Sequence, residues 1–78
     1  MKITEIEKEQ VEHKFLDWLR YELDDNEIGI NDNFLDIGGN SLIAISLIKR
    51  FEESYGRTIE MGKLYKLSLK DCIASTLS

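Results

Sequence analysis

The chain has 78 residues, of which 42% are hydrophobic and 32% charged, and its net charge is −5 at pH 7. A chain this short forms one domain, residues 1–78, with little room for a pocket that encloses a substrate. The acidic balance argues against a nucleic-acid-binding protein, and no apolar run is long enough to cross a membrane.

The charge and the cysteine content narrow the protein class further. Residues 1–36 hold eleven acidic and four basic residues, which we interpret as a solvated helix face and a charged loop, with an electrostatic partner surface as the alternative. Cys72 is the one cysteine and lies in an apolar run, so we expect it to be buried rather than reactive. No signal peptide is visible, and we therefore expect a cytoplasmic protein.

The first predicted helix runs from Thr4 to about Leu23. Thr4 and Glu7 have the spacing of a capping box, and Asp24-Asp25-Asn26 favours a turn at the other end. The apolar residues between these ends recur at helical spacing and predict a buried stripe: Val11, Phe15, Leu16, Trp18, Leu19 and Leu23.

A long loop is predicted over residues 24–40, because Gly29 and the run 31–33 break regular structure. A loop of this length in so small a domain is usually functional or packed by its own side chains. We expect its apolar residues to lie over the core: Ile28, Ile30, Phe34, Leu35 and Ile37.

The second predicted helix runs from Ser41 to Tyr55, with Gly56 as its C-terminal stop. Its predicted core face holds Ala44, Leu47, Ile48, Phe51 and Tyr55. Leu42 falls on the opposite, polar face, where burial does not explain it, and Ile45 lies at the boundary.

Two further helices complete the predicted fold. A short helix over 59–66 carries Met61, Leu64 and Tyr65, although Gly62 weakens it. The last helix starts at Ser68, which has capping-box spacing to Asp71. No segment alternates as a strand does. We therefore predict an all-α fold: a small four-helix bundle with three main helices, a short third helix and a long loop between the first two.

Metal binding is not expected. The acidic loop resembles the start of a calcium-binding loop. Counted from Asp24 as the first position, however, Ile28 stands at the fifth position and Leu35 at the twelfth, where oxygen ligands belong. Zinc needs about four ligands. His13, the one histidine, and the distant Cys72 cannot supply them.

Ser41 is the strongest candidate for a functional residue. Gly38-Gly39 allows a sharp turn before the helix, and a serine at the helix start has unpaired N–H groups beside its hydroxyl, which favour a phosphate. In the simpler alternative, Asn40 or Ser41 only caps the helix. Ser41 is not a catalytic nucleophile, because His13 lies in a charged stretch of another helix and no other imidazole exists. Modification by another enzyme is the more economical hypothesis.

The segment from Asp32 to Leu42 resembles the attachment motif of acyl and peptidyl carrier proteins. The matching positions are Phe34, Leu35, Ile37, Gly38, Gly39, Ser41 and Leu42. The order of predicted helices also resembles this family over nearly the whole chain. Two departures concern the third helix and the loop after it: Leu67-Ser68 stands where the family often has Pro-Thr, and Gly62 lies inside the helix.

The resemblance implies a carrier protein that is not itself an enzyme. A phosphopantetheinyl transferase would attach 4′-phosphopantetheine covalently to Ser41, and the thiol of that arm would carry acyl, aminoacyl or peptidyl groups as thioesters. The partners implied are an adenylation or acyl-loading enzyme and downstream condensing, tailoring or thioesterase enzymes, and we expect the carrier to be a monomer.

The subtype favoured is a peptidyl carrier of nonribosomal peptide synthesis or related secondary metabolism. The double glycine resembles that subtype. Fatty-acid carriers more often have Asp before the serine and a second helix rich in acids, whereas this chain has Asn40, Lys49 and Arg50. The alternatives are a carrier of a fatty-acid or polyketide pathway and, in another class, an unmodified helical interaction module.

Partner contact is predicted for Leu42 and Ile45 beside the arm, and for Met61 and Leu64 on the short helix. The alternative is that these are ordinary exposed apolar residues without a function. Met1 followed closely by a helix start favours a complete chain, although a domain excised from a multidomain synthase would have the same pattern.

Overall fold

A computed structural model describes residues 5–78 of the protein, which form four α-helices. These are α1 (Glu5–Leu23), α2 (Ser41–Tyr55), α3 (Met61–Lys66) and α4 (Leu69–Leu77). No strand forms within these residues, where one isolated β-bridge pairs Asn33 with Ser68. The all-α prediction with a short third helix and a long loop 24–40 is therefore confirmed. None of these four helices is long and apolar enough to span a membrane.

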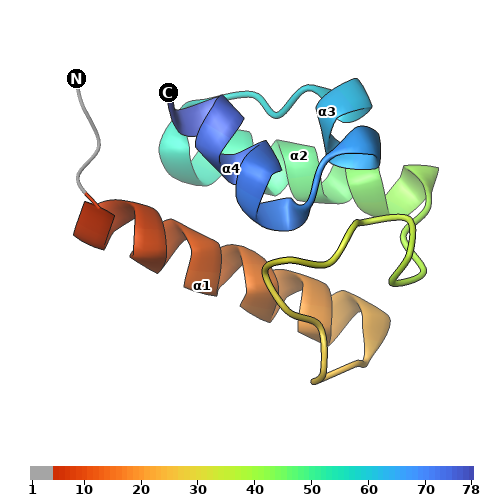
Figure 1. Cartoon of the computed structure of the whole chain (residues 1–78). Helices are drawn as coiled ribbons and strands as arrows, with labels where there is room; N and C mark the ends of the chain where they lie inside the picture. Colours follow the sequence, from red (N-terminus) through yellow and green to blue (C-terminus); the bar gives the residue numbers. More distant parts are fainter. Residues whose placement is uncertain (1–4) are drawn as a thin grey trace.

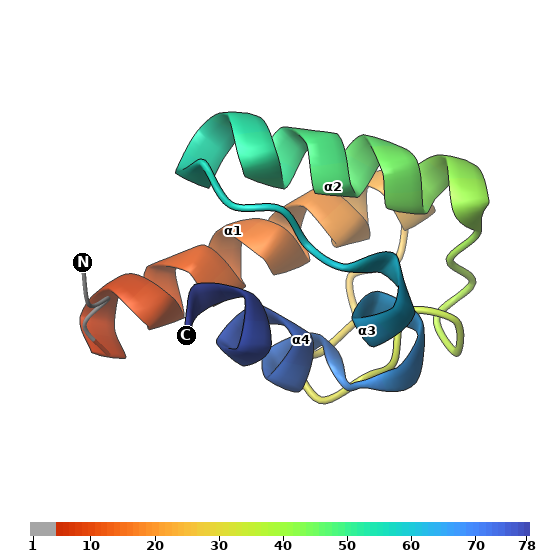
Figure 2. The ribbon, with the colours of Figure 1, turned by 90° about the horizontal axis from the view of Figure 1, so that it is seen from above.

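The helices form a small bundle in which α1 packs against α2 and α4, and α3 packs against α2 and α4 (Figure 1). Seen from above, the beginning of α2, the short α3 and the loop that leads into α2 lie at one end of the bundle (Figure 2). The beginning of α1 and the end of α4 lie at the other end. The residues around Ser41 are thus gathered at a single end.

The core contains apolar side chains from all four helices, from the loop 24–40 and from the connection 56–60. Its buried members are Val11, Phe15, Leu16, Leu19, Ile28, Phe34, Ala44, Leu47, Phe51, Ile59, Leu64, Leu69, Cys72, Ile73 and Leu77. The predicted stripes of the first and second helices face the core, with Trp18, Leu23, Ile48 and Tyr55 half-buried at its margin. Phe15 and Phe51 meet edge to face at 5.9 Å and join α1 to α2.

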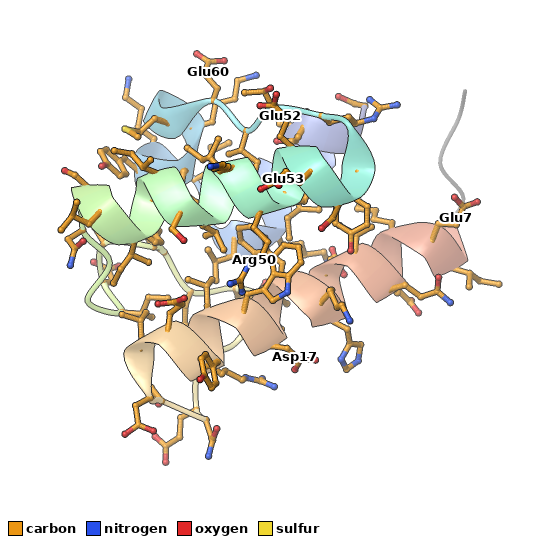
Figure 3. All side chains as sticks on the ribbon, turned by 180° about the vertical axis from the view of Figure 1, so that it is seen from behind. Glu7, Asp17, Arg50, Glu52, Glu53 and Glu60 are labelled. Carbon is orange, nitrogen blue, oxygen red and sulfur yellow. The ribbon has the colours of Figure 1, made fainter. Side chains whose placement is uncertain are left out.

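Arg50 covers the half-buried ring of Trp18 on the outside of the α1–α2 contact. Figure 3 shows its side chain reaching from α2 toward α1. The guanidinium carbon lies 5.6 Å from the centre of the indole ring, a cation–π arrangement. Of the two basic residues of α2, Lys49 and Arg50, Arg50 thus makes an intramolecular contact.

The helix ends follow the capping residues seen in the sequence. α1 ends at Leu23, and Asp24 takes a left-handed conformation with φ 50°. α2 ends at Gly56, also left-handed with φ 70°. At the start of α4, the Ser68 hydroxyl oxygen accepts a hydrogen bond from the Asp71 amide at 3.2 Å. The predicted start of α1 at Thr4 lies outside the described residues.

The third helix begins two residues later than predicted. Ile59 precedes it and is buried, and Glu60 occupies the cap position without a side-chain hydrogen bond. Leu64 is 0% exposed and belongs to the core. The prediction that Leu64 contacts a partner is therefore wrong, because its side chain points inward from a helix that covers the core.

The apolar loop residues are not all buried. Ile28 and Phe34 are fully buried, and Ile30 and Ile37 are half-buried. Leu35, predicted to plug the core, is instead 48% exposed. The turn that starts at Asn33 directs Phe34 inward and leaves its neighbour at the surface.

We expect Leu64→Ala to lower the free energy of unfolding by about 2–5 kcal/mol, because it leaves a cavity in a closed core. Leu42→Ala removes the same atoms from a side chain that is 80% exposed and should change it by less than about 0.5 kcal/mol. Urea unfolding of both variants measures the difference. Equal losses would show that Leu64 is not a core residue.

Candidate functional site

The loop before α2 is fastened to the rest of the bundle at several points. The Arg20 guanidinium donates two hydrogen bonds to the Ile28 carbonyl, at 2.9 and 2.7 Å. Further along, the Leu69 amide at the start of α4 donates to the Asp32 carbonyl at 2.8 Å. The loop therefore has a defined path over the core despite its length.

Asn33 makes long-range contacts that the sequence did not predict. From the sequence, we expected it only to break regular structure in the loop. Its side-chain nitrogen donates hydrogen bonds to the carbonyls of Tyr65 and Leu67, both at 3.0 Å. Its side-chain oxygen accepts one from the Leu35 amide at 2.9 Å. Asn–Phe before a glycine pair signals a turn, but nothing in the sequence indicates a partner more than thirty residues away.

Phe34 and the two glycines shape the turn into α2. The buried Phe34 ring stacks on Tyr65 with centroids 6.0 Å apart and an interplanar angle of 8°. A Cβ atom placed on Gly39 would lie 2.5 Å from that ring, and the Gly39 amide donates to the Phe34 carbonyl at 3.0 Å. Gly38 has φ 95°. The pair is thus needed for two reasons: a left-handed conformation at Gly38 and a close approach at Gly39.

Ser41 is the first residue of α2, and Asn40 is the cap. The Asn40 side-chain oxygen accepts a hydrogen bond from the Ile43 amide at 3.1 Å. The exposed Ser41 hydroxyl makes no hydrogen bond to the described residues, and neither the Ser41 nor the Leu42 amide has a partner among them. Of the two capping residues considered from the sequence, Asn40 fills the role and leaves the Ser41 hydroxyl available.

The surroundings of Ser41 suit a phosphate ester. The first turn of α2 carries no acidic residue, and the two unpaired amides at the helix start favour negative charge. No hydrogen bond joins Ser41 to His13, which is exposed on α1. Within residues 5–78, the Ser41 hydroxyl therefore lies where a phosphate would be stabilised, and no base lies beside it to activate it.

The acidic loop carboxylates serve the loop's own turns. The Asp25 carboxylate accepts a hydrogen bond from the Glu27 amide at 2.9 Å, and that of Asp32 accepts one from the Gly29 amide at 2.8 Å. Among the described residues, no three His, Cys, Asp or Glu side chains gather closely enough to hold a metal ion.

Cys72 is buried in the core, as predicted. Burial raises the pKa of its thiol to about 11, although the positive charge of Lys63 acts in the opposite direction. A thiol needs its deprotonated form to react, so Cys72 is both inaccessible and largely protonated at neutral pH.

Apolar surface lies along α2 beside Ser41. Leu42 is 80% exposed and Ile45 is 56% exposed. Ile45 also borders a surface groove of about 460 Å³ between α2 and α3, lined by Ile45, Ile48, Lys49, Glu52, Glu53 and Met61. Three of the four predicted contact residues thus reach the surface here, and Leu64 does not.

A model of the family described as "Phosphopantetheine attachment site" matches residues 9–75, which include the loop, Ser41 and all of α2 to α3. The chain belongs to this family. Its members are defined by covalently attached 4′-phosphopantetheine, and the chain is a carrier protein of this kind.

Curated relatives match between half and most of the chain. The chain is 31% identical over 68 residues, 87% of its length, to an indigoidine synthase of Dickeya dadantii. It is 41% identical over 39 residues, 50% of its length, to a dimodular nonribosomal peptide synthase of Bacillus subtilis. It is 46% identical over 41 residues, 53% of its length, to a nonribosomal peptide synthetase of Aspergillus terreus.

The aligned segments make up only 5% of the indigoidine synthase and 2% of each of the other two relatives. The chain therefore corresponds to a small part of much larger proteins. No solved structure gives a significant match.

We expect Gly39→Ala to lower the free energy of unfolding by about 1–3 kcal/mol, because the new methyl group collides with the Phe34 ring and carbonyl. Gly62→Ala is the matched control: it has open space around it in α3 and should stabilise the protein by about 0.4–1 kcal/mol. Thermal and urea unfolding measure both. If the two variants change stability in the same direction, close approach to Phe34 does not explain Gly39.

Proposed function

We propose that Ser41 is the attachment point of the 4′-phosphopantetheine arm, and that the chain presents aminoacyl or peptidyl thioesters in nonribosomal peptide assembly. The observation that carries the proposal is the exposed Ser41 hydroxyl at the start of α2, beside two unpaired amides and inside the matched family segment. Two of the relatives are nonribosomal peptide synthetases, which supports the pathway.

In the modification step, the Ser41 oxygen forms a bond to the phosphorus next to the pantetheine unit of coenzyme A. The P–O bond of the pyrophosphate bridge breaks, adenosine 3′,5′-bisphosphate leaves, and a base of the transferase accepts the serine proton. The amides at the start of α2 then face the phosphodiester. Once attached, the arm supplies a thiol that holds cargo as a thioester.

The chain itself contributes no catalysis in this proposal. Ser41 lacks a hydrogen-bonded base among the described residues. The groove beside α2 is open to solvent, and its lining residues do not surround a substrate with acid–base groups. A phosphopantetheinyl transferase would add the arm, an adenylation or acyl-loading enzyme would charge it, and condensing, tailoring or thioesterase enzymes would use the cargo. We place this work in the cytoplasm.

The charge pattern of α2 supports the peptidyl subtype over a fatty-acid carrier. Its first turn is uncharged, and Lys49 and Arg50 follow at its surface. Glu52 and Glu53 lie in the second half of α2, away from Ser41 (Figure 3). A partner with a basic patch would therefore meet little negative charge close to the arm.

Partner enzymes are proposed to contact Leu42 and Ile45 first. Both side chains are largely exposed and lie within two turns of Ser41. Met61 lines the same groove as Ile45 from α3. Leu35, exposed in the turn before Gly38, joins this set in place of the buried Leu64.

The attachment point is tested by intact mass. Apo protein incubated with coenzyme A and a broad-specificity transferase should gain one phosphopantetheine group, and Ser41→Ala should gain none. Ser46 is another exposed serine of α2, five residues after Ser41, so Ser46→Ala is the control and should be modified like the wild type. An adduct that persists in Ser41→Ala contradicts the proposal.

A thiol-reactive dye gives a second measure of the same reaction. Because Cys72 is buried with a raised pKa, native apo protein should label slowly, and the modified protein should gain one fast-reacting thiol. Fast labelling of native apo protein would contradict the buried position of Cys72.

We expect Leu42→Asp to raise the KM of the carrier in the transferase reaction about tenfold, the effect of about 1.4 kcal/mol, with an unchanged melting temperature. Ser54→Asp places the same charge at an exposed site near the other end of α2 and should leave KM unchanged. A sharp fall in the melting temperature of Leu42→Asp would instead place Leu42 in the core.

A further inference from the structure

The Asn33 side chain joins two parts of the structure, one before and one after Ser41 in the sequence. Its nitrogen reaches the carbonyls of Tyr65 and Leu67 at the end of α3, and its oxygen receives the Leu35 amide at the start of the turn into α2. One half-buried carboxamide therefore connects the α3–α4 junction to the turn that carries the glycine pair.

The chemistry of this contact selects asparagine. A carboxamide offers two donor hydrogens at one end and an acceptor at the other. The last carbonyls of a helix have no partner within it, and in the six-residue α3 two carbonyls near its end receive the Asn33 hydrogens. An aspartate would keep the acceptor for Leu35 and lose both donors, and an alanine would lose everything.

The next residue reinforces the same connection. Phe34 stacks on Tyr65 of α3, and Gly39 packs directly against Phe34. Two consecutive residues thus hold α3 to the turn, one through polar contacts and one through its ring. A shift of α3 relative to the loop would be passed on to Gly39 and hence to Ser41.

We infer that Asn33 is a positioning residue for reactions at Ser41. It holds Ser41 and α3, whose half-buried Met61 lines the surface groove, in one fixed arrangement, and an enzyme that docks across both recognises that arrangement. The inference rests on the proposed function of Ser41. Because the Ser41 hydroxyl itself is unchanged when Asn33 is altered, loss of the connection raises KM and leaves kcat nearly constant.

The test is the transferase reaction with Asn33→Asp. We expect KM for the carrier to rise about tenfold, equivalent to about 1.4 kcal/mol, with kcat within about twofold of the wild type. Arg20→Ala is the control, because it removes two hydrogen bonds to the Ile28 carbonyl at the other end of the loop. It should lower the melting temperature without raising KM.

A measurement on the unmodified protein separates this inference from the proposed function. In Asn33→Asp, the amide ¹H and ¹⁵N shifts of Gly38, Gly39 and Ser41 should change together with those of α3, and in Arg20→Ala they should not. If the wild type accepts no arm, the proposed function fails, and the shifts then show only whether Asn33 fixes the turn before Ser41.

Three results would overturn the inference. The first is an unchanged KM for Asn33→Asp in a wild type that is modified. The second is an equal rise in KM for Arg20→Ala, which would make the effect one of general stability. The third is a set of shift changes confined to residues that contact Asn33 directly.

Discussion

The Phe34 ring fills the space directly against Gly39, and the position of Ser41 depends on that contact. The ring is held from its other side by Tyr65, so α3, the loop and the start of α2 meet at one aromatic side chain. One residue, Asn40, separates Gly39 from Ser41, and it is fixed as the cap of α2. A small domain without a deep pocket can therefore still present one hydroxyl in a defined place.

Asn40 and Ser41 have different roles at the start of α2: Asn40 caps the helix, and Ser41 presents its hydroxyl to solvent. Because Asn40 supplies the capping oxygen, the neighbouring hydroxyl has no structural task among the described residues and stays exposed. Chemistry at Ser41 then costs the fold little, since the modified atom is not one that holds the helix. The Ser41 hydroxyl lies outside the core. The Cys72 thiol lies inside it, where it is shielded from solvent and burial raises its pKa.

The helix ends that have a capping residue were predictable because their causes are local. Gly56, Ser68 and the aspartates after Leu23 act on neighbouring backbone groups, and each ends or begins a helix as expected. The faces of the short α3 were not, because a six-residue helix has fewer than two turns and its periodicity cannot place Leu64 inside or outside. Leu35 and Phe34 are both apolar, and only the turn begun by Asn33 decides which is buried. The bonds from Asn33 to Tyr65 and Leu67 span more than thirty residues, so no local pattern signals them.

The turn from Phe34 to Gly39 is firmly held and fixes Ser41 before any partner binds. Amide hydrogen exchange of Gly39 in the unmodified protein tests it most directly, because that amide donates to the Phe34 carbonyl at 3.0 Å. We predict that Gly39 exchanges about as slowly as the core amides of α2, such as Leu47. Exchange at the rate of an unstructured peptide would contradict the claim and would leave Ser41 on a mobile loop.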